Sequence, residues 1–342
     1  MEAKQVRGLE RTVLRVRPLW SGLLIVGLIA TSARFVSDHY GAPAMLMALL
    51  FGIALHFLME QEQPRPGIAF ASQTVLRIGV ALLGLRISAD MALSLGWETL
   101  AIVTAGVLAT IVFGMAIARA FGFGLKFGFM SAGSVAICGA SAAMAIAAVL
   151  PKDGRSEERL VFTVVGVTVL STVAMIAYPI LADLFGFDAE LAGVFLGATI
   201  HDVAQVVGAG FSVSDRTGEV ATIVKLIRVA LLAPIVIIAA FVVRQSLKTN
   251  VGNGARPPLV PAFVVAFFLL LALNSTGYVP GWIRDVATEA SRWALLSAIA
   301  AVGVKTSLKD VVDVGGKAIA LLITQTVFIA VFALTALIWK SI

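Results

Sequence analysis

Apolar runs of about twenty residues recur along the whole of this 342-residue chain. A helix needs roughly 20 mostly apolar residues to cross a hydrocarbon layer about 30 Å thick, so the runs predict a bundle of membrane-spanning helices. Charged residues make up only 13% of the chain, against about a quarter in an ordinary soluble domain. The period-two alternation of membrane strands is absent from the sequence. We therefore expect an all-α polytopic membrane protein.

Eleven spans fit these runs, near residues 18–37, 42–58, 67–86, 97–121, 126–150, 158–184, 189–211, 218–244, 259–275, 286–304 and 316–339. Five basic residues precede the first span. Because Lys and Arg concentrate on the cytoplasmic side of a membrane, residues 1–17 are predicted to be a cytoplasmic segment. No convincing small-residue cleavage site follows, so the first span is expected to be retained. Residues 18–342 then form a single transmembrane domain.

An internal repeat relates the third and tenth spans. Residues 81–88 align with residues 300–307 at a constant offset of 219, and Gly96 meets Gly315 at the same offset. The two hairpins are seven spans apart, and an odd separation places them in opposite orientations. Inverted repeats, here roughly 18–184 and 189–342, are a recurring plan of secondary transporters, which bind substrate where the halves meet.

The fifth span carries small polar residues and glycines. Ser134, Cys138 and Ser141 fall at i, i+4 and i+7, which places them on one helical face. Gly133 and Gly139 weaken a helix by about 1 kcal/mol each relative to alanine. Such a segment can open within the membrane and direct a half-helix N-terminus at an anion. Close packing of membrane helices is the alternative explanation, because small residues favour it as well.

The seventh span combines ionisable and amide side chains with glycines. His201 and Gln205 lie at i and i+4, and Asp202 points to a different part of the helix surface. An imidazole can donate to an anion, while a carboxylate can hold a coupling proton or Na⁺. The alternative is a buried His–Asp pair or a helix cap. Ionisable groups are costly in hydrocarbon and tend to mark transport pathways, so we favour a functional role.

Two cations lie inside the eighth span. Lys225 and Arg228 are three residues apart, so both project from one side of a helix. Like charges this close repel when desolvated, and a bound anion would relieve the repulsion. They could instead snorkel to an interface or pair with Glu219 or Asp202. Arg77, also within a span, is a weaker candidate for the same role.

Several other signals point to structure or exclude functions. Glu289 and Arg292 are i,i+3 neighbours and are expected to form a structural pair, while His56 is expected at an interface. Cys138 is the only cysteine, which excludes an intrachain disulfide and a thiol-rich metal site. No phosphate-binding glycine loop, zinc pattern or nucleophile elbow occurs, so we expect neither an enzyme nor an ATP-driven pump.

Four segments together resemble one known family. They are Gly84-Leu-Arg-Ile-Ser88, Ile137-Cys138-Gly139-Ala-Ser141-Ala, Gly197-Ala-Thr-Ile-His201-Asp202-Val-Ala-Gln205-Val and Lys225-Leu-Ile-Arg228-Val. The chain is similar over nearly its whole length to the sulfate exporter family of bacterial inner-membrane proteins. That family is grouped with the bile acid:sodium symporter and cation:proton antiporter superfamily. The resemblance implies two inverted halves, a core and a panel domain, and crossing interrupted helices.

We therefore predict a secondary transporter of a small anion, sulfate or a sulfonate, with H⁺ or Na⁺ coupling and no other cofactor. The anion-binding residues are predicted to be Ser134, Cys138, Gly139, Ser141, His201, Gln205, Lys225 and Arg228. Asp202 or His201 is predicted to carry the coupling ion. The expected partners are the anionic solute and the bilayer, with no nucleic acid, and a homodimer is kept open as the assembly. Two rival functions are a cation:proton antiporter with Asp202 as carrier and a non-transporting sensor or assembly subunit.

Overall fold

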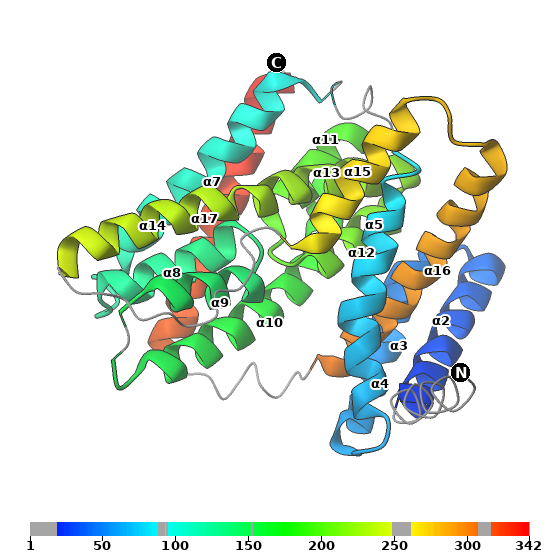
Figure 1. Cartoon of the computed structure of the whole chain (residues 1–342), viewed down its shortest axis with the longest axis horizontal. Coiled ribbons are helices and arrows are strands. Elements are labelled where there is room, and N and C mark those ends of the chain that lie inside the picture. The colour runs from blue at the N-terminus through cyan, green and yellow to red at the C-terminus, as the bar shows by residue number, and fades with distance from the viewer. Residues whose placement is uncertain are drawn as a thin grey trace, which may run out of the picture.

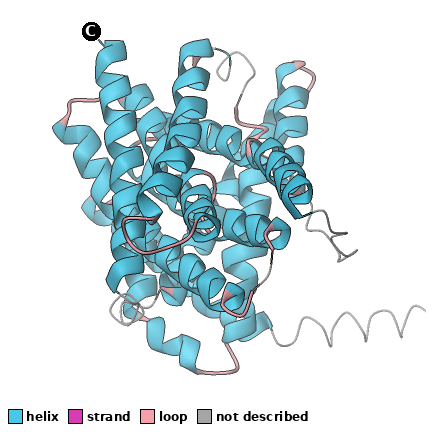
Figure 2. Cartoon of the chain, turned by 90° about the vertical axis from the view of Figure 1, so that its left-hand side faces the viewer, coloured by secondary structure: helices cyan, strands magenta, loops and turns pink. Residues whose placement is uncertain are grey.

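The computed structural model describes residues 19–87, 93, 95–151, 153–247, 261–306 and 316–341, and helices are the regular structure of this part of the chain (Figures 1 and 2). The all-α prediction is confirmed there. The predicted cytoplasmic segment 1–17 lies outside the described residues, as do Ser88, Ser307 and Gly315 of the repeat.

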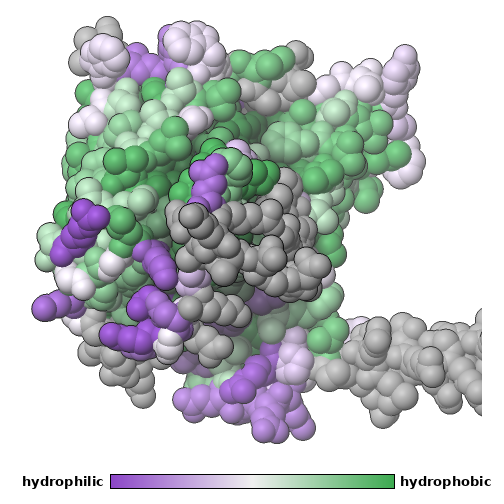
Figure 3. All heavy atoms as spheres, turned by 60° about the vertical axis from the view of Figure 1, so that its left-hand side comes forward, coloured by the Kyte–Doolittle hydropathy of each residue, from purple (hydrophilic) through white to green (hydrophobic). Residues whose placement is uncertain are grey.

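Within the described residues, six helices are long and apolar enough to cross a membrane: Trp20–Tyr40, Arg65–Leu83, Gly96–Ala118, Glu158–Leu184, Asp215–Val243 and Gly316–Lys340. Apolar side chains cover a broad part of the surface in Figure 3, and hydrophilic residues gather mostly toward its upper and lower edges. Five further apolar helices have only 10–17 residues. These helices do not correspond one to one to the eleven predicted spans, because the predicted spans 126–150 and 189–211 each contain two short helices.

A first bundle occupies the right side of Figure 1. Its helices are α2 (Trp20–Tyr40), α3 (Ala44–Ala54), α4 (Arg65–Phe70), α5 (Leu76–Leu83), α15 (Ala262–Ser275) and α16 (Gly281–Lys305). A π-helical turn, η3 (Ala71–Val75), joins α4 to α5, and a short 3₁₀ helix, η2 (His56–Glu60), follows α3. Helix α16 lies at the centre and packs against α2, α3 and α5.

A second bundle occupies the centre and left of the same view. It contains α7 (Gly96–Ala118), α8 (Leu125–Ala136), α9 (Ala140–Val149), α10 (Ser156–Leu184), α11 (Ala189–Thr199), α12 (Val203–Val213), α13 (Asp215–Ala230) and α17 (Gly316–Ser341). Helix α14 (Leu232–Leu247) continues from α13 and contacts α9. The two bundles meet mainly where α12 packs on α3 and α16.

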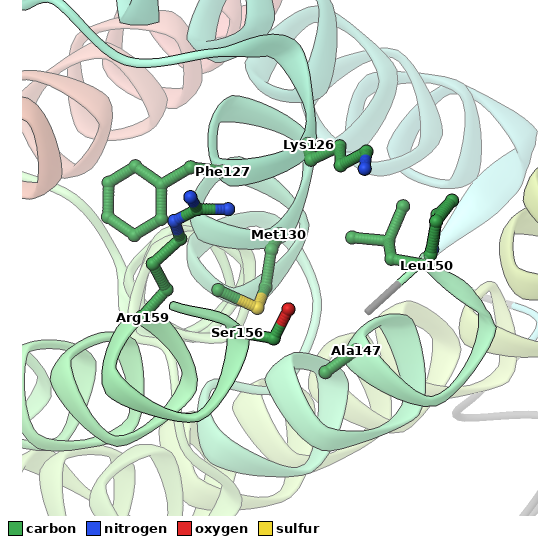
Figure 4. Close-up of a pocket in the computed structure, with 8 residues that line it drawn as sticks. Lys126, Phe127, Met130, Ala147, Leu150, Ser156 and Arg159 are labelled. Carbon is green, nitrogen blue, oxygen red and sulfur yellow. The ribbon is translucent and has the colours of Figure 1, made fainter. Parts of the chain in front are cut away.

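Helices α8 and α9 form a helical hairpin, called hairpin 1 (Leu125–Val149). A Cβ on Gly133 of α8 would collide with the side chain of Ile146 of α9, thirteen residues later. The start of α8 and the end of α9 lie together beside the start of α10 and enclose a small cavity of about 30 Å³ (Figure 4). The predicted interruption is present, but the single span predicted over 126–150 is wrong. With 12 and 10 residues, the two arms are only about 18 and 15 Å long, and they fold back on each other.

Helices α11 and α12 form the equivalent hairpin 2 (Ala189–Val213). Arg216, at the start of α13, pairs with Glu190 at 2.9 Å, and the Thr217 hydroxyl donates to the Ala189 carbonyl at 3.0 Å. Because α13 begins directly after α12, these bonds bring the end of α12 back to the start of α11. The predicted span 189–211 is therefore also two short arms and not one crossing.

The two hairpins enter the molecule from opposite ends of α10. The base of hairpin 1 adjoins the first turns of α10, and hairpin 2 starts at Ala189, five residues after α10 ends at Leu184. Helix α10 has 29 residues and is about 43 Å long. The tips meet between these ends, since a Cβ on Gly139 would lie 3.8 Å from the Cβ of His201. This antiparallel arrangement places two helix breaks side by side in the interior.

Matching contacts tie the bundle helices together. A Cβ on Gly84, at the end of α5, would collide with the carbonyl oxygen of Phe267 in α15. A Cβ on Gly303, at the end of α16, would collide in the same way with the carbonyl oxygen of Leu49 in α3. Only glycine allows these backbones to approach so closely. The two repeat glycines thus perform the same packing role at two separate places.

A second pair of contacts follows the same pattern. His56, after α3, bonds through Nδ1 to the Val304 carbonyl at 2.8 Å, which fixes it to α16. The side-chain amide of Asn274, near the end of α15, donates to the Ile87 carbonyl after α5 at 3.2 Å. His56 therefore connects α3 to the end of α16, where the sequence predicted an interfacial residue.

Candidate functional site

Lys225 of α13 lies directly beneath the two hairpin tips. Its Nζ donates to the carbonyl oxygens of Ile137 at 2.6 Å, Ile200 at 3.0 Å and His201. The side chain is fully buried. An ammonium group has three donors, and all three are used on the backbone of the tips.

Arg228 lies one turn further along α13 and is fully buried as well. Its guanidinium donates to the carbonyls of Ala136 at 2.8 Å and Val135 at 2.9 Å, both at the end of α8. It also donates to Gly197 and Ile200 at 2.9 Å each, at the end of α11. One arginine therefore binds the last carbonyls of both entering arms.

These bonds revise the predicted role of the two cations. Each helix C-terminus carries about half a negative charge and up to four unpaired carbonyls, and two such ends meet here. The carbonyls, and not a bound anion, offset the repulsion between Lys225 and Arg228. Neither side chain lines the large cavity between the hairpin tips and the first bundle. Glu219, a possible partner of the two cations, pairs with Arg86 and not with them. In this structure Lys225 and Arg228 support the hairpin tips, and their direct binding of substrate stays a prediction.

A cavity of about 500 Å³ lies between the hairpin tips and the first bundle. Its walls come from α9, α10, α12 and α13 on one side, and from the α4–α5 helix, the start of α15 and the end of α16 on the other. The polar and ionisable residues among its lining are Ser72, Gln73, Arg77, Cys138, Ser141, Thr168, Asp202, Gln205, Lys305 and Thr306. The cavity has the size of a small-molecule site.

The start of α9 faces this cavity without a side-chain cap. Gly139 precedes the helix with φ +61°, a left-handed conformation that favours glycine and reverses the chain at the tip. The first N–H groups of a helix have no intrahelical partner and carry partial positive charge. Cys138, Ala140 and Ser141 line the cavity beside them. This end of α9 is therefore equipped to bind an anion.

The start of α12 also faces the cavity, but it carries its own carboxylate. Asp202 is the N-cap residue, and its side chain accepts from the Ala204 amide at 3.3 Å. Its own amide donates to the Ser171 hydroxyl of α10 at 3.0 Å. The carboxylate supplies negative charge where an anion would otherwise bind. Asp202 thus matches the alternative prediction of a helix cap while remaining on the cavity wall.

Gln205 lies one turn into α12 and lines the same cavity. Its side chain is only 1% exposed, and its amide nitrogen lies 3.5 Å from the Thr172 hydroxyl. The amide oxygen has no hydrogen-bond partner among the described residues. A buried polar atom without a partner carries a free-energy cost, which a bound ligand or ion could remove.

His201 and Ser134 are close to the site but are not part of the cavity wall. His201 is fully buried, with Nε2 2.9 Å from the Thr326 hydroxyl of α17. Ser134 is fully buried and donates to the Met130 carbonyl at 2.8 Å. Of the predicted anion ligands, the structure brings Cys138, Ser141 and Gln205 together on the cavity wall, and Gly139 forms the turn between Cys138 and α9. His201 and Ser134 instead support the tips from behind.

Two cations complete the cavity wall. Arg77 of α5, which the sequence marked as a weaker candidate, and Lys305 at the end of α16 both belong to the wall that the first bundle provides. Lys305 belongs to the 300–307 segment of the repeat and was not a predicted ligand. The signal that could have selected it is a lysine in the last position of an apolar helix, matched by Arg86 in the other repeat. No cluster of three or more His, Cys, Asp or Glu side chains suited to a metal ion occurs in the described part of the chain.

Comparisons with known proteins agree on one family. A sequence model of the family described as conserved hypothetical protein 698 matches residues 21–322. UPF0324 membrane protein TauZ of Paracoccus pantotrophus is 57% identical over 323 residues, which cover 94% of this chain and 96% of that protein. A UPF0324 membrane protein of Chlorobaculum tepidum is 50% identical over 329 residues, or 96% and 92% of the two chains. The similarity thus includes both hairpins and both bundles.

Proposed function

Because the chain belongs to the conserved hypothetical protein 698 family of UPF0324 membrane proteins, we propose that it is a secondary transporter of a small oxyanion. The observation that carries this proposal is the uncapped start of α9 at the wall of a 500 Å³ cavity that also contains Arg77 and Lys305. A helix N-terminus on one wall and two cations on the facing wall attract negative charge to this cavity. Sulfate or a small sulfonate has the charge and size for this space.

The repeat supports a transport mechanism with two alternating states. Gly84 and Gly303 are 219 residues apart, and their carbonyl partners Leu49 and Phe267 are 218 apart. The hydrogen-bonding side chains His56 and Asn274 are also 218 apart. Two halves that exchange equivalent contacts in this way are what an inverted repeat requires. We propose that α3, α5 and α7 correspond to α15, α16 and α17.

The hairpins fit the same plan in a permuted order. Hairpin 1 with α10 corresponds to hairpin 2 with α13, since each hairpin is followed by the helix that packs on it. In this scheme the second hairpin precedes the helices α15–α17 of its repeat, whereas the first hairpin follows α3–α7. The repeat boundaries proposed here therefore differ from the simple halves 18–184 and 189–342. Placement in the sulfate exporter family and in a bacterial inner membrane remains part of this proposal.

Asp202 is the proposed site of cation coupling. It is the single carboxylate on the described cavity wall, next to Gln205 with its unpartnered amide oxygen. A proton or Na⁺ on Asp202 would remove the negative charge that opposes an incoming anion. The cation and the anion would then bind together and move together.

Thermal stability of the purified full-length protein tests anion binding. Sulfate and ethanesulfonate should raise the melting temperature more than chloride at equal ionic strength, because a ligand that binds only the folded state stabilises it. Replacing Arg77 or Lys305 by Gln should weaken the apparent affinity about tenfold, as loss of a charge-assisted contact does. Arg155→Gln, on an exposed loop, is the matched control. Equal stabilisation of all three variants would contradict the proposal.

A cation:proton antiporter is the second candidate, because Asp202 lies on the cavity wall and carries negative charge. Proteoliposomes separate the two functions. An antiporter dissipates an imposed pH gradient when Na⁺ is added, whatever the anion. The anion transporter proposed here responds only when sulfate or a sulfonate is present.

A further inference from the structure

A second, smaller cavity lies on the side of the molecule that the large cavity does not reach. Its volume is about 270 Å³, and its lining includes Phe211 at the end of α12, Asp215 at the start of α13, and Arg292 and Leu296 of α16. These residues surround the base of hairpin 2. On α16, Arg292 is thirteen residues before Lys305, which is about 20 Å along the helix. The two cavities therefore occupy opposite ends of the molecule, with the tips between them.

The repeat relates the two cavities to each other. At the offset of 219, Gln73 and Arg77 of the large cavity correspond to Arg292 and Leu296 of the small one. Both pairs lie on matched helices, α5 with its π-helical turn and α16. The small cavity is thus placed where an inverted repeat would put the counterpart of the large one.

Ion pairs close this second end. Arg86, just after α5, pairs with Glu219 at 2.5 Å and with Asp215 at 3.0 Å, while Arg292 of α16 pairs with Asp215 at 2.9 Å. The Arg86 and Glu219 side chains are only 13% and 14% exposed, and the guanidinium lies 5.6 Å from the ring centre of Phe211. Each pair joins the first bundle to α13 of the second bundle.

The residue that corresponds to Arg86 at the large-cavity end of the pathway is in a different state. Lys305 corresponds to Arg86 at the repeat offset, lies on the wall of the large cavity, and forms no ion pair within 4.0 Å among the described residues. Among the described residues, three ion pairs between the bundles hold one end of the pathway, and no such pair holds the other end. In a transporter that works by alternating access, the two repeats are related by symmetry, but one end of the pathway is closed while the other is accessible.

We propose that Arg86, Asp215, Glu219 and Arg292 form a gate that closes the hairpin-2 end of the pathway. The same class of ligand, a small oxyanion, then meets Arg86 and Arg292 when the gate opens. This inference rests on the proposed transport function. Opening separates half-buried charges from their partners, so an anion that takes the place of Asp215 and Glu219 stabilises the open state.

Cys138 provides a reporter for the gate because it is the chain's only cysteine and lines the large cavity at the tip of hairpin 1. The probe is methanethiosulfonate ethylsulfonate, an anionic thiol reagent that does not cross membranes. It is applied to right-side-out and inside-out vesicles that contain the full-length protein. In the wild-type protein, modification should be fast from one face and slow from the other. In Arg86→Gln and Glu219→Gln, modification from the slow face should accelerate about tenfold or more, the population shift expected when ion pairs of one state are lost.

Two further variants keep the result interpretable. Arg216→Gln removes an ion pair on the same side that joins α11 to α13 within one bundle, so it should leave the slow face slow. The charge swap Arg86→Glu with Glu219→Arg should restore the slow rate, whereas a merely damaged fold would stay fast. Unchanged modification from the slow face in both single variants, or no rescue by the swap, overturns the gate. The rise in melting temperature with sulfate tests the proposed function separately. Sulfate can fail to stabilise the protein while the gate variants still change the modification rate, and sulfate can stabilise it while the gate variants have no effect.

Discussion

The two hairpin tips share a backbone plan and differ in chemistry. In both, an arm ends at carbonyls that Lys225 and Arg228 bind, and a second arm begins at the cavity. Tip 1 turns through Gly139 and leaves α9 without a side-chain cap, whereas tip 2 places Asp202 on the first turn of α12. The first tip therefore attracts an anion and the second repels it. This difference is the basis for the proposed division of roles, with the anion at tip 1 and the coupling cation at tip 2.

Removing the shared support should damage both tips at once. Lys225→Met keeps most of the side-chain volume but leaves the buried carbonyls of Ile137 and His201 without their donor, while Ile200 keeps its bond from Arg228. An unsatisfied buried polar group costs about 1–3 kcal/mol, so we expect a loss of several kcal/mol and little folded protein. Yield and melting temperature of the purified variant measure this effect. Arg216→Gln serves as the control, since its ion pair is half-exposed. Wild-type stability of Lys225→Met would refute the support role.

The sequence anticipated the breaks but not the fold-back. The glycines near Gly139 correctly predicted a break in the fifth span, and the family resemblance implied interrupted helices elsewhere. However, a 25-residue apolar run fits one crossing as well as a hairpin, because length and hydropathy are the same for both. What decides between them is the contact of Gly133 with Ile146 and of Ala189 with Thr217, and such pairing leaves no periodic signal in the sequence.

The partners of the buried cations were unpredictable for a related reason. Lys225 and Arg228 bind carbonyls that lie 24–93 residues away, and backbone carbonyls are present at every position. Sequence reasoning could identify the cost of burying two charges but offered only an anion or a carboxylate as compensation. Two helix C-termini that meet in space supply the same negative potential without any side chain.

A strained turn at tip 1 should weaken anion binding specifically. Gly139→Ala forces a left-handed φ of +61° on alanine, at a cost of about 1–3 kcal/mol, and distorts the start of α9. Gly186→Ala is matched to it, because Gly186 has φ +66° in a loop with open space around it. Both variants should melt earlier by similar amounts. Only Gly139→Ala should lose stabilisation by sulfate, and equal sulfate responses would place the anion elsewhere.

Neutralising tip 2 should make the tips more alike. Asp202→Asn retains a good N-cap, since asparagine and aspartate cap helices about equally well, but it removes the negative charge. We expect sulfate to bind a few-fold more tightly and the response to Na⁺ or pH to disappear, because the cation no longer has a carboxylate to neutralise. Melting curves over sulfate concentration at two pH values measure both changes. Weaker sulfate binding in this variant would mean that Asp202 supports the anion site directly.

The base of hairpin 1 gives the prediction with the smallest expected effect, a slight change in melting temperature. Base 1 adjoins Asp153, where the Arg155 backbone amide and then Arg159 hold the pKa of the carboxyl below its ordinary value of 3.8. A lowered pKa in the folded state stabilises the protein above the ordinary value, and this contribution is lost as pH falls through the folded-state pKa. Wild-type protein should therefore melt slightly above Asp153→Asn at neutral pH, and the difference should vanish in acid. The carboxylate is exposed to solvent, so salt should reduce the difference as well. A difference that persists in acid would show that Asp153 acts through the loop backbone and not through its charge.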